Sequence, residues 1–487
     1  MNRQLRRLGI GLFVLYLALF VQLNVVQVLR ADEYNDNPSN TRAVTRDFTE
    51  PRGQILSAEG NVLARSDKAS GRFPRQRVYP LGDLFGPITG FFSFDVGTDG
   101  VEKTYNDELT GRTTAGSIGD VTDLVLDSTR TLDVALTMPV AVQQAAREAL
   151  RGLRGSVVAL DPRDGSILAL YSNPTFDPNP LSSVDLEAAA ASRRFFLADP
   201  TKPLLARSFR ETFFPGSTFK IVTGSAGLTS GEVTPTSPRY PASSGYTPPL
   251  TNRPIRNFGG GTCGGDLFQI LEVSCNTAFA QMGVDIGADN LVGQAEAFGF
   301  NERPPIDLPS ATASPIAAPG EFVQNTPVLA QTAIGQNAVS STPLQMALTT
   351  AGIANNGVVM KPHVMSEVRD DEDQVLRRYR PEPWKQALSP QVARTMRDAM
   401  VGVVADGTAG RLAVEGVPTA GKTGTAQIGD GRSHAWIVGF APADNPRVAI
   451  AVIVESQSGA SEATGGRLAA PIGQQVLRAA LAATSGS

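Results

Sequence analysis

The sequence predicts a multi-domain α+β protein that a single N-terminal helix attaches to a membrane. Three observations support this fold class. The chain has 487 residues, more than one ordinary domain accommodates. Residues 8–29 form an uncharged, largely apolar stretch that is long enough to cross a bilayer. Beyond this stretch, short runs with the two-residue period of strands, bounded by turn residues, alternate with runs typical of helices.

The composition narrows the class of function. Hydrophobic residues make up 41% of the chain and charged residues 18%, as in a globular protein with a large core. The net charge is −4 and no basic run follows the first few residues, which argues against a nucleic-acid-binding protein. The only histidines, His363 and His434, lie in unrelated contexts. We therefore expect no metal, no cofactor and no Ser-His-Asp triad, so a catalytic serine would need lysine as its base.

Residues 1–30 are predicted to form a cytoplasmic N-terminus and a transmembrane anchor. Arg3, Arg6 and Arg7 precede the apolar stretch, and basic residues favour the cytoplasmic side. At about 1.5 Å per residue, the stretch gives roughly 30 Å of helix. A buried helix of a soluble protein is one alternative. A cleaved signal peptide is another, but residues 28–31 offer no small-x-small cleavage site. With an anchor, everything after this segment lies outside the cytoplasm.

Residues 31–152 are predicted to form a small mixed α/β module without an obvious site. Residues 31–50 are polar and charged, as expected of a juxtamembrane linker. Residues 52–64 predict two strands joined by a tight Glu-Gly-Asn turn. Residues 132–137 alternate like a strand, and the run that follows, up to Leu150, has helical spacing with a proline near its first turn.

Residues 153–487 are predicted to form the largest domain, an antiparallel sheet flanked by helices. The domain opens with a β-hairpin, passes through a long loop rich in Pro and Gly, and closes with a meander of strands and a helix. The predicted strands cover residues 157–161, 167–171, 420–427, 435–440 and 448–455, and the predicted helices start at Ser217, Leu267, Thr277, Pro343 and Gln474.

A candidate nucleophile lies at the start of the first of these helices. Pro215 and Gly216 precede Ser217, as at many helix starts. Lys220 follows three residues later, so both side chains share one helix face. The positive end of the helix dipole favours an alkoxide or oxyanion there. Together with desolvation, it would lower the pKa of Lys220 enough for this amine to act as a base. Ser-x-x-Lys is common by chance, so without further motifs Ser217 could be a plain N-cap.

Two more motifs follow in chain order. Ser274 and Asn276 flank Cys275 at a loop-to-helix junction, and Lys422-Thr423-Gly424 lies on a predicted strand. Alone, the first pair could cap a helix and the lysine could be a solvated residue of an edge strand. Together and in this order, the three motifs resemble those of the penicillin-binding proteins and serine β-lactamases, Ser-x-x-Lys, Ser-Asp-Asn and Lys-Thr-Gly. The second motif departs from that pattern, because Cys275 stands where the family has aspartate.

The resemblance extends over nearly the whole chain. Arg52-Gly53-Gln54-Ile55 is similar to the start of the non-catalytic module of class B, monofunctional penicillin-binding proteins, and residues 158–179 to the opening of their transpeptidase domain. Gly335-Gln336 and Thr342–Gln345 are similar to a further family segment. The chain has no room for the glycosyltransferase domain of class A members. Its short N-terminal module and Ser-Cys-Asn motif are most similar to the actinobacterial penicillin-binding protein A group.

The resemblance implies a serine β-lactamase-like fold and a peptidoglycan D,D-transpeptidase that cross-links stem peptides ending in D-Ala-D-Ala. Ser217 would form an acyl-enzyme after Lys220 removes its proton, and β-lactams would acylate the same serine. Ser274 would relay protons to the leaving amine, and Asn276 would hold the lysine and the substrate amide. The family's oxyanion hole corresponds here to the backbone N–H groups of Ser217 and Thr425, each typically contributing about 3 kcal/mol.

The third motif would bind the end of the substrate. In this interpretation Lys422 is a fixed positive charge for the terminal carboxylate, which the hydroxyls of Thr423 and Thr425 also bind. Gly424 would leave space for a substrate strand to lie alongside. The resemblance further implies a role in cell-wall synthesis linked to division and cell shape, with a lipid-linked glycan polymerase as partner.

Two other functions stay open at this stage. The first is hydrolysis by a D,D-carboxypeptidase or a β-lactamase. Class A β-lactamases need a glutamate that activates water, and no convincing candidate lies between Asn276 and Glu321. The second is a non-enzymatic β-lactam sensor or division scaffold that keeps the fold.

Cys263 and Cys275 are the only cysteines. Outside the cytoplasm an even count permits a disulfide, which would contribute roughly 3 kcal/mol and fix the loop that carries Ser274. Two separate thiols are the alternative.

Overall fold

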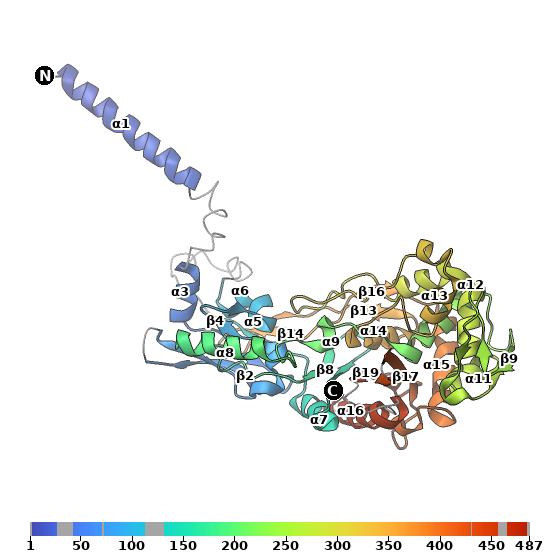
Figure 1. The fold of residues 1–487 in the computed structure, drawn as a ribbon. Coiled ribbons are helices and arrows are strands. Elements are labelled where there is room, and N and C mark those ends of the chain that lie inside the picture. The colour runs from blue at the N-terminus through green and yellow to red at the C-terminus, as the bar shows by residue number, and fades with distance from the viewer. Residues whose placement is uncertain are drawn as a thin grey trace.

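The protein consists of an N-terminal helix and a body with two main sheets (Figure 1). The computed structural model describes residues 2–26, 42–70, 73–112, 131–429, 431–455 and 465–484. The first helix, α1, spans Asn2–Asn24. Its stretch from Arg3 to Asn24 has a mean hydropathy of 1.6, and none of it is buried against the protein. By length and composition, this helix can cross a membrane.

Part of the predicted linker is a helix. α3 spans Arg42–Thr49, whereas residues 31–41 lie outside the described residues. Phe48 of α3 is buried, and its ring stacks on that of Phe92 with the centroids 4.2 Å apart. The prediction followed the polar composition of the segment. The structure differs because this one aromatic side chain docks the segment onto the module.

The N-terminal module is built on a mixed six-stranded sheet with the order β15-β14-β6-β1-β2-β3. β1 and β2 form the predicted antiparallel pair, and β6 lies parallel to β1. β14 and β15 come from far along the chain, inside the range predicted for the largest domain. The strands are β1 (Ile55–Leu56), β2 (Val62–Lys68), β3 (Arg75–Val78), β6 (Asp133–Leu136), β14 (Met365–Arg369) and β15 (Val375–Arg378).

A buried ion cluster ties this sheet to helix α5 (Gly100–Thr104). Glu102 accepts hydrogen bonds from Arg52 Nε and Arg77 Nε, both at 2.6 Å, and all three side chains are almost fully buried. Arg77 also donates to the carbonyl of Gly53 at 2.8 Å. One carboxylate between two guanidinium groups satisfies buried charge with short, charge-assisted hydrogen bonds. The module's remaining short elements are η2 (Gly82–Leu84), α4 (Gly86–Thr89), β4 (Phe92–Ser93), β5 (Gly97–Thr98) and α6 (Asn106–Leu109).

The second main sheet has five antiparallel strands in the order β17-β18-β19-β7-β8. Every residue of β19 is buried, so both faces of the sheet are covered. α14 packs on one face, and α7 and α16 pack together on the other (Figure 1). The strands are β7 (Gly155–Leu160), β8 (Ile167–Asn173), β17 (Ala420–Gly429), β18 (Arg432–Ala441) and β19 (Val448–Val454), and the helices are α7 (Val140–Leu150), α14 (Pro343–Ala354) and α16 (Ala470–Ala483).

A helical region lies beside β17, the edge strand of this sheet. α10 (Lys220–Ser230) packs on α12 (Asn276–Ala297), and α15 (Pro390–Ala405) contacts β17 and α11 (Leu267–Glu272). Thr342 caps α14 as predicted, because its hydroxyl accepts from the Gln345 N–H. The other elements are α8 (Leu186–Ala198), α9 (Arg207–Arg210), η4 (Gly216–Phe219), β9 (Tyr240–Ser243), β10 (Gly245–Tyr246), β11 (Ile255–Arg256), η5 (Phe258–Gly260), β12 (Cys263–Gly265), η6 (Pro319–Phe322), α13 (Thr326–Thr332), β13 (Val358–Met360), β16 (Pro383–Gln386), η7 (Gly410–Leu412) and the π-helical turn η8 (Gly465–Ala469).

Candidate active site

The three sequence motifs meet at one cleft of about 1300 Å³. η4 brings the first motif, the α11–α12 junction the second, and β17 the third. Five of the predicted catalytic and substrate-binding residues line the cleft: Ser217, Ser274, Asn276, Thr423 and Thr425. The two lysines of the motifs, Lys220 and Lys422, are fully buried beside it.

Glycines allow the turn that carries Ser217. Gly216 has a φ of 54°, and its N–H donates to the carbonyl of Gly335 at 2.9 Å. A Cβ on Gly335 would lie 2.0 Å from the carbonyl oxygen of Gly216, so a side chain cannot be accommodated at this crossing. The Gly335-Gln336 segment therefore packs directly against the turn that carries Ser217, and Gln336 lines the cleft.

Gly424 belongs to the packing around this turn, and it is not among the residues that line the cleft. A Cβ at this position would lie 2.9 Å from both Thr218 Cγ2 and Trp436 Cβ. We predicted that this glycine leaves space for a substrate strand. The structure shows a packing reason for this glycine, the close approach of β17 to the Ser217 turn, and its role beside a substrate strand stays a prediction.

Lys220 is held by the second motif. Its Nζ donates to Asn276 Oδ1 at 2.7 Å, to the Ser274 carbonyl at 2.8 Å and to Ser274 Oγ at 3.2 Å. Asn276 Nδ2 in turn donates to the carbonyl of Arg256 at 3.0 Å. Ser217 Oγ is not among the hydrogen-bond partners of this amine in the structure. Catalytic hydrogen bonds of this kind often tighten only when substrate is bound.

Ser274 Oγ lies between the two buried amines. Lys422 Nζ donates to it at 2.8 Å and to the carbonyl of Thr423 at 3.1 Å. The backbone of Ser274 has a φ of 58°, in the left-handed region that costs a non-glycine residue free energy. The fold therefore holds this serine in a strained conformation that places its hydroxyl between Lys220 and Lys422.

Burial controls the charge of both amines. It lowers the pKa of Lys422 to about 7. Burial, and then the nearby Lys422 ammonium, lower the pKa of Lys220 well below its ordinary value of 10.5. Within the described residues, no carboxylate is a hydrogen-bond partner of either amine. The lowered pKa of Lys220 was expected. The structure directs the amine of Lys422 at Ser274 Oγ, and the role of Lys422 as a positive charge for the substrate carboxylate stays a prediction.

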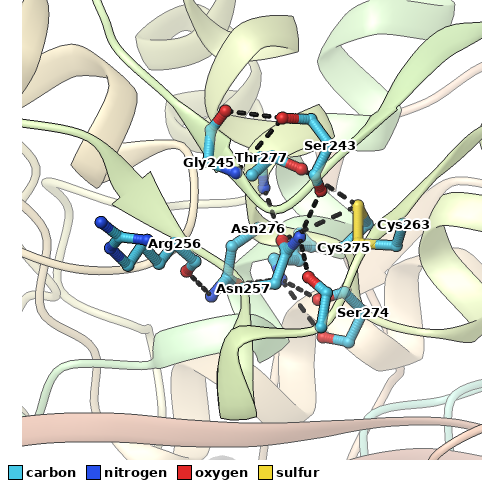
Figure 2. The surroundings of a disulfide bond; sticks show 11 residues. Ser243, Gly245, Arg256, Asn257, Cys263, Ser274, Cys275, Asn276 and Thr277 are labelled. Carbon is cyan, nitrogen blue, oxygen red and sulfur yellow. Dashed lines mark hydrogen bonds between the residues drawn. A yellow bond between two sulfur atoms is a disulfide. The ribbon is translucent and has the colours of Figure 1, made fainter.

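A disulfide joins Cys263 of β12 to Cys275, the residue between Ser274 and Asn276 (Figure 2). The bond fastens the predicted long loop to the N-terminus of α12, directly beside the second motif. Nothing in the sequence alone decided between this bond and two free thiols.

Asn257, which the sequence analysis missed, provides a second connection at the same place (Figure 2). Its Oδ1 accepts from the Thr277 N–H at 3.0 Å, and its Nδ2 donates to the carbonyl of Ser243 at 2.8 Å. The signal was weak, since asparagine is common in Pro- and Gly-rich loops for its local hydrogen bonding.

The rim of the cleft is basic. Arg256, Arg411 and Arg467 line it, and no aspartate or glutamate is found among the described lining residues. Thr408, another residue that the sequence analysis missed, also lines the cleft, and its Oγ1 lies 2.7 Å from Thr423 Oγ1. Such a site can attract an anionic ligand and offers a serine hydroxyl next to desolvated amines.

Two family descriptions match the chain. Residues 155–478 match the "Penicillin binding protein transpeptidase domain" and residues 52–131 the "Penicillin binding protein A dimerisation domain". The chain is 38% identical to peptidoglycan D,D-transpeptidase PbpA of Mycolicibacterium smegmatis over 499 residues, which cover 99% of both proteins. It is 36% identical to PbpA of Mycobacterium tuberculosis over 503 residues, again with 99% of both covered.

Solved structures give the same result. The chain is similar to penicillin-binding protein A from M. tuberculosis in its ceftriaxone acyl-enzyme complex, with a TM-score of 0.82 and 36% identity over 90% of this chain and 100% of that one. For the penicillin G acyl-enzyme complex of the same protein, the TM-score is 0.81 at 36% identity, over 89% and 100% of the two chains.

Proposed function

The chain belongs to the class B penicillin-binding proteins, and on this premise we propose how its cleft performs peptidoglycan D,D-transpeptidation. The protein is a serine-type D,D-transpeptidase and a target of β-lactams. The observation that supports our assignment of roles is the arrangement of Ser217 at the cleft, with the Ser274 hydroxyl hydrogen-bonded to two buried amines.

Acylation begins with proton transfer from Ser217 Oγ to the neutral amine of Lys220. The oxygen then forms a bond to the carbonyl carbon of the penultimate D-Ala, and the carbonyl electrons move to its oxygen. The backbone N–H groups of Ser217 and Thr425 donate hydrogen bonds to this developing oxyanion, each contributing about 3 kcal/mol of barrier reduction. Asn276 keeps the amine in place through the 2.7 Å hydrogen bond to Lys220 Nζ.

Collapse of the tetrahedral intermediate breaks the C–N bond of the terminal residue. Ser274 donates its hydroxyl proton to the departing nitrogen and regains a proton from an ammonium group. Lys220 and Lys422 both lie within hydrogen-bonding distance of Ser274 Oγ, at 3.2 and 2.8 Å, so either can return the proton. Free D-Ala leaves, and the stem peptide stays attached to Ser217 as an ester.

The carboxylate of the substrate binds to the hydroxyls of Thr423 and Thr425. Both residues line the cleft on β17, whereas Lys422 lies behind them and donates to Ser274. Arg256 and Arg411 add positive potential at the rim, which favours anionic stem peptides during their approach. A β-lactam presents a comparable carboxylate beside its reactive amide.

Transfer to an amine of a neighbouring stem peptide completes the reaction. The acceptor nitrogen attacks the ester carbon and loses its proton to the Lys220–Ser274 pair, and Ser217 Oγ is released with a proton. Hydrolysis of the kind seen in class A β-lactamases requires a glutamate that activates water. No carboxylate occurs among the described residues that line the cleft, which favours transfer over this hydrolytic route.

We further propose how the chain is organised in the cell. Residues 1–30 form a cytoplasmic N-terminus and a single membrane span, residues 31–152 a pedestal, and residues 153–487 the extracytoplasmic transpeptidase domain. α1 has the length and hydropathy for such a span. A lipid-linked glycan polymerase would supply the strands, in wall synthesis linked to division and cell shape.

A depsipeptide that mimics the stem-peptide terminus tests the reaction. With a D-amino acid as acceptor, the full-length enzyme should form the transfer product, and the Ser217→Ala variant should form neither this product nor a penicillin adduct. Hydrolysis at the same rate with and without acceptor would instead identify a carboxypeptidase. Cells that grow normally with Ser217→Ala, but not after deletion of the whole gene, would identify a scaffold.

A further inference from the structure

A threonine outside the three motifs contacts the substrate-binding strand. Thr408 lies in the turn that follows α15 and lines the cleft, and its Oγ1 is 2.7 Å from Thr423 Oγ1. We propose that Thr408 is a positioning residue that directs the hydroxyl proton of Thr423 at the carboxylate of the substrate. This inference rests on the proposed function, because it concerns recognition of the same substrate group.

The turn that carries Thr408 is fixed from two sides. The Thr408 N–H donates to the carbonyl of Glu272 at 3.3 Å, and a Cβ on Gly407 would lie 2.4 Å from that carbonyl oxygen. On the other side, a Cβ on Gly466 would lie 2.7 Å from the carbonyl oxygen of Thr408. Backbone is therefore packed against backbone here, and the Thr408 hydroxyl has a defined position relative to β17.

This turn also connects two of the motifs. Glu272 ends α11, two residues before Ser274, and Thr423 follows Lys422 on β17. The hydrogen bond from the Thr408 backbone to Glu272 and the contact of its side chain with Thr423 thus tie the second motif to the third. A substrate that spans both motifs meets hydroxyl groups whose separation Thr408 helps to set.

The direction of the hydrogen bond between the two threonines matters for binding an anion. A hydroxyl has one proton to donate and two lone pairs to accept with. When Thr408 donates to Thr423 Oγ1, the proton of Thr423 remains available to a carboxylate in the cleft. In the reverse direction, Thr423 would present only lone pairs to the carboxylate. An anionic ligand therefore selects the orientation in which Thr408 donates, and this donation also makes Thr423 a better donor.

The surroundings of the two hydroxyls fit these roles. Thr423 is 7% exposed, and the partner of its hydroxyl among the described residues is Thr408, which is itself open to the cleft. Without the Thr408 hydroxyl, the Thr423 proton is free to rotate away from the ligand. Binding of the carboxylate then loses part of one charge-assisted hydrogen bond, for which a tenfold change is the expected order of magnitude.

Two variants and two substrates test the proposal in the full-length enzyme. Thr408→Val removes the hydroxyl at nearly constant volume, and Thr408→Ser keeps it. The substrates are an acyl-D-Ala-D-lactate depsipeptide and the same compound with its terminal carboxylate converted to a carboxamide. We expect Thr408→Val to lower kcat/KM about tenfold for the carboxylate and less than twofold for the carboxamide. Thr408→Ser should stay within about threefold of the wild type on both.

Other outcomes overturn the proposal. An equal loss on both substrates would mean that Thr408 only supports the fold, and no loss on either would mean that Thr423 is oriented without it. If Thr408→Val does not fold, a Thr408→Ser enzyme that loses selectivity for the carboxylate also contradicts the proposal. In all of these cases the proposed function still stands, provided that the wild-type enzyme turns over the carboxylate substrate. If even the wild type is inactive and not acylated at Ser217, the proposed function and this inference fall together.

Discussion

Two buried clusters of charged residues in this protein use the same low-dielectric environment in opposite ways. In the N-terminal module, one carboxylate, Glu102, lies between the guanidinium groups of Arg52 and Arg77. At the active site, one hydroxyl, that of Ser274, lies between the amines of Lys220 and Lys422. Burial penalises charge in both places, and the central group differs between them.

The Glu102 carboxylate stays charged between its two arginines, whereas the Ser274 hydroxyl offers no negative charge to its two lysines. Burial alone would raise the pKa of Glu102, but Arg77 and Arg52 outweigh it and hold that pKa below its ordinary value. No carboxylate among the described residues pairs with the two amines, and burial lowers the pKa of Lys220 and Lys422. The first cluster is therefore a structural clamp, whereas the second contains an amine, that of Lys220, which can be neutral and take a proton.

The largest expected effect follows from removing the base. Lys220→Met keeps the shape of the side chain but cannot accept a proton. The second-order rate constant of acylation by fluorescent penicillin should fall about 10²–10⁴-fold, as for loss of a general base. The midpoint of thermal unfolding should shift by only a few degrees. A variant that is acylated within tenfold of the wild-type rate would show that another group activates Ser217.

The structural cluster should respond in the opposite way. Glu102→Gln leaves Arg52 and Arg77 buried without a counter-ion, which should cost about 3–5 kcal/mol of unfolding free energy. Acylation of the folded protein should stay within about twofold, since Glu102 is not among the residues that line the cleft. Asp67→Asn is the matched control, because Asp67 forms an ion pair with Arg65 on the exposed side of the same sheet. The unfolding free energy of both variants can be measured by chemical denaturation. Equal losses in the two would contradict the role of Glu102 as a structural clamp.

A smaller effect concerns how each cluster is held. The active-site cluster depends on a loop that the Cys263–Cys275 disulfide closes over a sequence separation of 12, and such a bond contributes roughly 3 kcal/mol. Reduction should lower the thermal midpoint and slow acylation less than tenfold, because Asn257 still holds Thr277. A Cys263→Ser/Cys275→Ser double variant should have the thermal midpoint and acylation rate of the reduced enzyme, and reductant should change neither. Unchanged stability on reduction would contradict this account of the loop.

The smallest expected effect is a difference in pH dependence between the acylation rate, which depends on the lysines, and the stability, which depends on Glu102. Acylation requires neutral Lys220, so its rate should rise with pH until that amine has lost its proton. It should fall again as the pH passes about 7, because Lys422 then loses the positive charge that polarises the Ser274 hydroxyl, to which its amine donates at 2.8 Å. Glu102 has a lowered pKa, so its contribution to stability is present above about 4.5 and is lost only in acid. Both the acylation rate and the thermal midpoint should be measured across this pH range. An acylation rate that rises steadily to pH 10 would contradict the predicted role of Lys422.

The sequence predicted the site better than its electrostatics. The family, the fold class, the strands from β17 to β19 and the helix starts at Leu267 and Thr342-Pro343 follow from local patterns, which act over a few residues. The lowered pKa of Lys422 was not predicted, because it depends on burial by segments that are distant in sequence. The ion pair of Arg52 with Glu102 was also not predicted, because the two residues are 50 positions apart in the sequence.

Long-range pairing accounts for most of what was missed. β14 and β15 join the sheet of the N-terminal module from residues 365–378, and no local signal ties them to β6. α8 and α15 were not predicted either. Thr408 and Asn257 are single polar residues in Gly-rich turns, and only the folded chain reveals that they contact Thr423 and the start of α12.

Titration of the lysine side chains would test the central claim most directly. The chain has seven lysines, few enough for ¹³Cε-lysine NMR to follow each resonance, with Lys220→Met and Lys422→Met variants for assignment. We expect two resonances to titrate far below the ordinary pKa of 10.5, with that of Lys422 near 7, and each to be missing from the corresponding variant. Seven lysines that all titrate above about 10 would leave Ser217 without a neutral base and contradict the account.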